Sequence, residues 1–206
     1  MLDRARHSMR PRASPDAYEQ LERSSPEERA AIVLRLMEDH PHGRLELPSR
    51  DGASANLCGL DLSPEAMQAL YGRRLRNNPP TWSDREFQCV RLVRANLQGA
   101  NLFHANLSRA HLQYANRRQA RLWMADLSES LLLGANLTGA SLMATNLRNA
   151  SLVGATLVDA GMRDSDCSRA NLEYADLRGV NAWKASFAGA YLRDAALQGV
   201  ALRTRT

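Results

Sequence analysis

The chain has 206 residues, of which 44% are hydrophobic and only 5% aromatic, and its formal net charge at pH 7 is +5. No apolar run approaches the roughly 18 residues of a membrane-spanning helix, and the basic N-terminus lacks the apolar segment of a secretory signal. The three cysteines are odd in number and widely scattered, so they form neither a disulfide framework nor a metal site. We therefore expect a cytoplasmic protein with no membrane partner.

The first 44 residues are predicted to form an arm followed by a helix. The chain begins polar and rich in arginine, and we assign a flexible basic arm to residues 1–24. Ser25 precedes a proline and two glutamates, the pattern of an N-cap followed by proline and acids in the first helical turn. Apolar residues from Ile32 to Met37 lie on one stripe, so residues 25–44 are predicted to hold an N-terminal helix.

Residues 45–84 combine two patterns. Leu47, Leu57 and Leu62 stand at multiples of five residues, in the register of a later repeat, which predicts a first coil of that repeat over 45–64. An apolar helical face then follows a Ser-Pro-Glu start, and an Asn-Asn-Pro-Pro run ends it. We expect a helical insertion over 65–84.

A five-residue repeat occupies residues 85–206 without insertion or deletion. In the 24 units between Arg85 and Thr204, the third residue is Leu in 18 and the first is Ala in 17. A period of five fits neither a helix nor a flat strand, so neither element keeps these residues on one side. A coil with four five-residue sides does, with Leu and Ala pointing inward. Below, positions in a unit are counted from the Ala.

The units, such as Ala95-Asn96-Leu97 and Ala135-Asn136-Leu137, resemble those of the pentapeptide-repeat family. The resemblance implies an all-β solenoid, a right-handed quadrilateral β-helix of six to seven coils, here with small N-terminal α-helical elements. The best-known members are acidic dimeric rods that resemble DNA, bind DNA gyrase and protect it from quinolones. A shared fold does not by itself carry that function.

One side of the solenoid is expected to present large side chains to water, one at the fourth position of each coil. This ladder side consists of Phe103, Trp123, Met143, Arg163, Trp183 and Arg203. Exposed apolar side chains in a row predict an interface, either with the N-terminal helices or with a protein partner. Stacking on nucleic acid is a weaker interpretation, because few positive charges accompany the aromatic residues. A smaller apolar strip on the opposite side consists of Val93, Leu131, Leu133 and Val153.

A third side carries acidic residues, and this acidic side consists of Glu86, Asp126, Glu129 and Asp166. Its flat, wet surface has nothing to shape a pocket or raise a pKa, so we expect no catalytic residues, no metal and no cofactor. Residues 85–206 carry 15 basic and 9 acidic residues, a net charge of +6. That charge opposes mimicry of DNA.

Two further features break the regularity of the repeat. Arg117 stands at a third position, where Leu should point inward, and we expect the turn to distort and release its side chain. The sequence ends directly after the last repeat, so Phe187, Leu192, Leu197 and Leu202 are expected near an open edge. Gyrase-protecting relatives dimerise through this end, and we predict a homodimer through the C-terminal coil.

Three functions compete on these observations. The first is a non-catalytic scaffold that binds a protein partner through an exposed side. The second is a gyrase- or topoisomerase-binding protein that confers self-resistance to a gyrase poison. The third is binding of nucleic acid or another polyanion by the basic solenoid, which should weaken steeply with salt.

Overall fold

A computed structural model describes residues 19–21, 23–25, 28–29, 31–33 and 92–202. The coil expected over 45–64 and the helical insertion expected over 65–84 lie outside the described residues. So do Glu86 of the acidic side and Arg203 of the ladder side.

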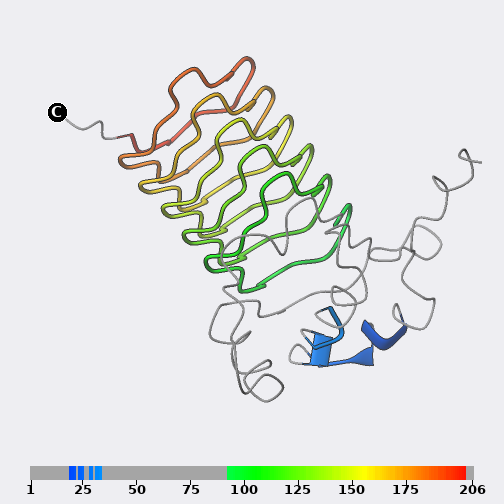
Figure 1. The fold of residues 1–206 in the computed structure, drawn as a ribbon. Helices are drawn as coiled ribbons and strands as arrows, with labels where there is room; N and C mark the ends of the chain where they lie inside the picture. The colour runs from blue at the N-terminus through cyan, green and yellow to red at the C-terminus, as the bar shows by residue number, and fades with distance from the viewer. Residues whose placement is uncertain (1–18, 22, 26–27, 30, 34–91, 203–206) are drawn as a thin grey trace, which may run out of the picture.

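Residues 92–202 form a right-handed quadrilateral β-helix, as the repeat predicts, with 20 residues in each coil. Eighteen parallel bridges each join a residue to the one 20 positions later, from Asn96↔Asn116 to Asn181↔Ala201. Figure 1 shows the coils stacked into a rod that runs from green near residue 92 to red at the C-terminal end. The strands are single bridges between turns, because five residues leave room for one extended segment and one turn on each side.

Backbone hydrogen bonds use four of the five N–H groups in a typical unit. The first donates to the carbonyl of the preceding Leu and closes a turn, the second bonds back to the previous coil, and the third and fifth bond to the next coil. The fourth N–H has no backbone acceptor, and the Asn or Asp at the second position accepts it through its side chain, as from Gln98 to Asn96 Oδ1 at 3.3 Å. The residues that accept in this way are Asn96, Asn101, Asn106, Asn116, Asp126, Asn136, Asn146, Asp166, Asn171, Asp176 and Asn181. The Asn of the repeat is therefore a structural residue, since it satisfies the donor that the ladder leaves over.

The turns place every fifth-position residue from Arg94 to Gly199 at positive φ, the conformation that a type II turn requires. Seven of these residues are glycines and fifteen are not. A non-glycine residue in this region costs about 1–2 kcal/mol. The hydrogen-bond ladder and the buried core must offset that cost, so the repeat tolerates almost any side chain at its corners.

The core is a column of Leu and Ala side chains, nearly all fully buried between residues 95 and 182. At three first positions Ala is replaced by a residue with a buried hydroxyl group, and these residues are Ser130, Thr145 and Ser165. Each hydroxyl donates to a main-chain carbonyl at 2.6–2.7 Å. Cys167 replaces Leu, and burial raises the pKa of its thiol to about 12. These substitutions leave the backbone pattern intact, because each group either is apolar or finds an acceptor.

The expectation that the turn at Arg117 distorts and releases the side chain is wrong. The side chain is 0% exposed, and the backbone keeps the standard pattern, with its N–H bonded to Asn136 O at 2.7 Å. The turn after it is also regular, since Ala120 N–H donates to Arg117 O at 3.1 Å and Gln119 has φ 56°. The bonds to the neighbouring coils hold this backbone in place, so the guanidinium stays inside.

Helical residues in the N-terminal region are 19–21, 23, 28–29 and 31–33. Ser25 caps the second group as expected, and it forms a capping box: Glu28 N–H donates to Ser25 Oγ at 3.3 Å, and Ser25 N–H donates to Glu28 Oε2 at 2.8 Å. Residues 19–21 and 23, which the sequence predicts to lie in the flexible arm of 1–24, are helical, and Leu21 is fully buried. Leu21 and Val33 belong to the same hydrophobic cluster as Leu92.

Candidate functional site

The bridges join residues 20 positions apart, and this register places the fourth-position residues of the ladder side one above another. Phe103 and Trp123 lie in adjacent coils with ring centroids 5.1 Å apart, and Phe103 also meets His104 edge-on at 4.4 Å. Trp123 is 41% exposed, Met124 beside it is exposed, and Met143 is half-buried. The rings of Phe103 and Trp123 therefore support each other, while Trp123 and Met124 face water.

Trp183 forms the other end of the ladder side together with two cations. Arg163 Cζ and Lys184 Nζ each lie 4.0 Å from the indole ring centroid, which is the geometry of a cation–π contact. Arg163 Nε also pairs with Asp164 at 3.2 Å. Lys184 has no acidic partner in the described part of the chain, so this end carries an uncompensated positive charge.

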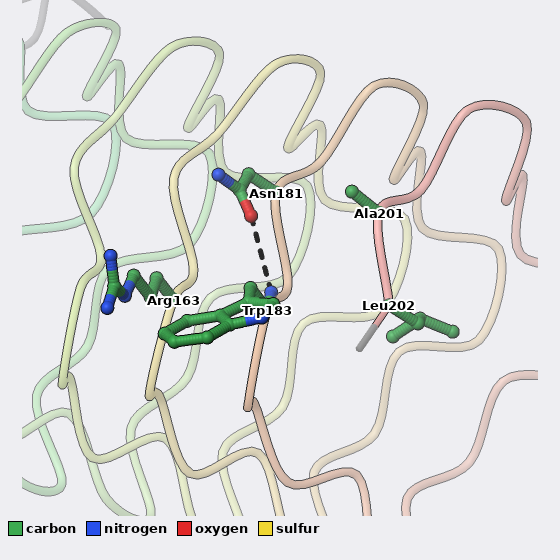
Figure 2. A pocket seen from close by; sticks show the side chains of 5 residues that line it. All are labelled: Arg163, Asn181, Trp183, Ala201 and Leu202. Atoms are coloured by element: carbon green, nitrogen blue, oxygen red, sulfur yellow. Dashed lines mark hydrogen bonds between the residues drawn. The ribbon is translucent and has the colours of Figure 1, made fainter. Parts of the chain in front are cut away.

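An open pocket of about 450 Å³ lies beside Trp183, and Figure 2 shows its lining: Arg163, Asn181, Trp183, Ala201 and Leu202. Asn181 Oδ1 accepts the backbone N–H of Trp183 at 3.3 Å, so the side-chain N–H₂ of Asn181 remains a donor. The polar side chains of the lining offer a guanidinium and an amide, and the remaining side chains offer an indole and two aliphatic groups. This combination suits a partner segment in which an apolar side chain lies next to a carboxylate.

The ladder side also departs from the repeat at its second positions. Arg121, Ser141 and Gly161 replace Asn or Asp in three consecutive coils. The backbone N–H groups two residues later belong to Trp123, Met143 and Arg163. Within the described chain these N–H groups consequently have no acceptor. The opposite strip shows the same departure at His111, Leu131 and Ser151. Sequence reasoning missed this signal, although it could be read from the second position of each unit.

The opposite strip is exposed at Val93, Leu131 and Leu133, with Val153 half-buried. At its corner, the Tyr114 ring lies over Gly134, so closely that a Cβ on the glycine would come within 2.6 Å of the ring. This strip also carries a cation over an aromatic ring, because Arg193 lies 5.7 Å from the Tyr174 ring centroid, but that arginine is paired with Glu173 at 3.2 Å.

The acidic side is electrostatically satisfied. Glu129 pairs with Arg109 at 2.9 Å and Asp166 with Arg148 at 3.0 Å, while Asp126 accepts the Asn146 amide at 3.0 Å. Partial burial opposes ionisation of Asp166, but hydrogen bonds from Ser168 and the Arg148 guanidinium together hold its pKa below the usual value. No group of three possible metal ligands occurs among the described residues. The geometry supports neither acid–base chemistry nor a run of unpaired negative charge.

At the C-terminal end of the described solenoid, burial of the core residues falls away. Phe187 and Leu192 are half-buried, whereas Leu197 is 47% exposed and Leu202 is 63% exposed. The described portion has no helix with the length and apolar character needed to span a bilayer.

Comparison with known proteins identifies the repeat. The family model described as pentapeptide repeats matches residues 91–122, 125–164 and 165–203 in eight copies. No curated protein matches the chain. Among solved structures, it is 30% identical to the pentapeptide repeat protein Rfr23 from the cyanobacterium Cyanothece 51142, covering 55% of this chain and 87% of that one with a TM-score of 0.45.

Two further solved structures are similar. One is alr5209, a pentapeptide repeat protein from Nostoc Pcc 7120, at 33% identity over 48% of this chain and 84% of that one, with a TM-score of 0.40. The other is full-length QnrB1, a plasmid-mediated fluoroquinolone resistance protein, at 19% identity over 73% of this chain and 78% of that one, with a TM-score of 0.31. The family match covers more than half of the sequence, and the β-helix carries the same period. The chain therefore belongs to the pentapeptide-repeat family.

Proposed function

We propose that this protein is a non-catalytic cytoplasmic scaffold that binds a protein partner through the ladder side. The observation that carries the proposal is the row from Phe103 to Trp183, in which Trp123 is 41% exposed and the side chains of Phe103, Met143 and Trp183 are half-buried. Large apolar side chains held in a row on a solvent-facing surface are typical of interaction sites.

The rigidity of the solenoid favours this use. Each ladder residue is attached to a coil whose backbone is bonded on both sides, so little main-chain entropy is lost when a partner binds. Trp and Arg are also the residue types that dominate binding energy at protein interfaces. The ladder side offers both without rearrangement.

Charge indicates the kind of partner segment. Among the described residues, the ladder side and its corner carry Arg121, Arg163 and Lys184 against the single acid Asp164. A partner segment that combines apolar or aromatic side chains with Asp or Glu would match this surface.

A site-specific photo-crosslinker tests the proposal in the intact protein. Placed at Met143 on the ladder side, it should form a covalent adduct with one defined partner in extract of the native host. At Arg148 on the acidic side of the same coil it should not. Equal yields at both sites, or no adduct at Met143, would contradict the proposal.

Gyrase or topoisomerase binding with self-resistance is the second candidate, and family membership supports it. The pairing of Glu129 and Asp166 with arginines weighs against it, because it removes the free acids that would contact a DNA-binding surface. A supercoiling assay with and without a quinolone separates the two: protection of gyrase would favour this second function. Polyanion binding ranks third and predicts affinity that falls steeply with salt.

We also propose a homodimer through the C-terminal coil, on the basis of the exposed Leu197 and Leu202 side chains. Joining two apolar ends by a two-fold axis would bury both and close the assembly. Light scattering should give twice the monomer mass of 22.9 kDa. Replacing Leu197 and Leu202 by Glu should return the monomer mass, whereas a monomeric wild-type chain would refute the dimer.

A further inference from the structure

Arg117 is the only charged side chain enclosed within residues 92–202. It is 0% exposed, and its Nε, Nη1 and Nη2 atoms have no hydrogen-bond partner. A guanidinium presents five N–H donors, so all of its hydrogen-bonding capacity is unmet.

The other polar groups of the core differ from Arg117 in this respect. The hydroxyls of Ser130, Thr145 and Ser165 all reach a main-chain carbonyl, and no carboxylate is buried in the described part of the chain. Burial lowers the pKa of Arg117 from 12.5 to about 9, so the side chain still carries its charge at neutral pH. An enclosed cation without a counter-ion is strongly unfavourable compared with the same cation in water.

A solenoid confines such a penalty to one place. Each coil contacts only its neighbours, so the stability of the rod is a sum of terms for single coils and for the contacts between adjacent coils, and a weak coil can open without unfolding the whole rod. The coil of residues 112–131 carries the guanidinium, whereas the side chains that replace Leu in the later coils are uncharged.

We propose that the coil of residues 112–131 is the conformational weak point of the solenoid, which opens to bring Arg117 into water before the later coils open. Opening breaks the bonds from Leu97 N–H to Asn116 O and from Arg117 N–H to Asn136 O, each 2.7 Å long. Trp123 lies in the same coil, so opening also interrupts the ladder side between Phe103 and Met143. The rod is thus divided into an N-terminal part and a more stable C-terminal part.

Amide hydrogen exchange on the full-length protein tests this division. Leu97, Arg117, Leu137 and Leu157 lie in one column, and each N–H donates to the next coil at 2.7 Å. We expect the protection factors of Leu97 and Arg117 to be at least about tenfold lower than those of Leu137 and Leu157. Arg117→Leu should remove this difference, because Leu is the usual residue of the column.

The neighbouring arginine provides the matched control. Arg118 is exposed, so Arg118→Leu should leave the exchange pattern unchanged. Arg117→Met, which removes the charge but keeps a long flexible chain, should raise protection as Arg117→Leu does. Equal protection along the column in the wild-type protein would overturn the proposal. So would failure of both Arg117 variants to slow exchange, or an equal effect of Arg118→Leu.

Discussion

The ladder side and the acidic side share one backbone, one register and one turn geometry, yet they use the second position of the repeat differently. On the acidic side Asn106, Asp126, Asn146 and Asp166 each accept the N–H two residues later. On the ladder side the three central coils lack that acceptor, and large side chains stand where the N–H is left over.

The difference separates residues that build the coil from residues that are free to serve another purpose. A side with complete Asn or Asp acceptors and paired charges is fully satisfied by its own chain. A side that gives up these bonds in successive coils loses the stabilisation that they supply, and its second positions carry Arg121, Ser141 and Gly161 instead. Changes on the two sides should therefore affect different measurements.

The largest expected effect is on binding. Replacing Trp123 and Trp183 by Ser should lower the affinity for the partner by about 30-fold or more, since aromatic anchors at interfaces are commonly worth ~2 kcal/mol. The affinity for the crosslinked partner, measured by calorimetry, checks this result. The control is Glu129→Ser with Asp166→Ser, which should leave affinity unchanged. Equal losses in both double variants would remove the distinction between the two sides.

The next largest effect is on the free energy of unfolding, and here substitutions on the acidic side should matter more than those on the ladder side. Asn146→Ala removes the acceptor of the Arg148 N–H at 3.1 Å and the bond to Asp126, and should lower the free energy of unfolding by about 1–2 kcal/mol. Ser141→Ala, at the equivalent position of the ladder side, should have almost no effect, and Ser141→Asn should stabilise by up to ~1 kcal/mol. Urea unfolding measures all three. Similar losses for Asn146→Ala and Ser141→Ala would show that the second position does not distinguish the sides.

The smallest effect is the pH dependence that Asp166 contributes on the acidic side. The pKa of Asp166 is lowered in the folded protein by hydrogen bonds that outweigh partial burial. The folded state therefore favours the ionised carboxylate, and this contribution is complete above the unfolded pKa of 3.8 and is lost as the pH falls through the folded pKa. Asp166→Asn keeps the side-chain oxygen but has no charge to titrate. Its unfolding free energy should fall less than that of the wild type between about pH 5 and pH 2, and parallel curves would contradict this assignment.

The sequence by itself determined the architecture, because the information for it is local. A five-residue period with Leu and Ala at fixed positions has one economical solution, a four-sided coil, and each unit repeats the same turn. The placement of Trp123 and Trp183 on one side follows from that register, since 20 residues return the chain to the same side. The recurring Asn of the repeat can be read from the sequence, but only the hydrogen bond seen in the structure explains its role as an acceptor for a backbone N–H.

Only the tertiary structure decided how side chains 20 residues apart meet. The pairing of Arg109 with Glu129 depends on rotamers and neighbours in the next coil, which no period specifies. Both cations placed on Trp183 depend on the same local packing. Arg117 is the sharpest case. Its chemistry predicted release into water, but the bonds of two neighbouring coils hold its backbone in register and keep the charge inside.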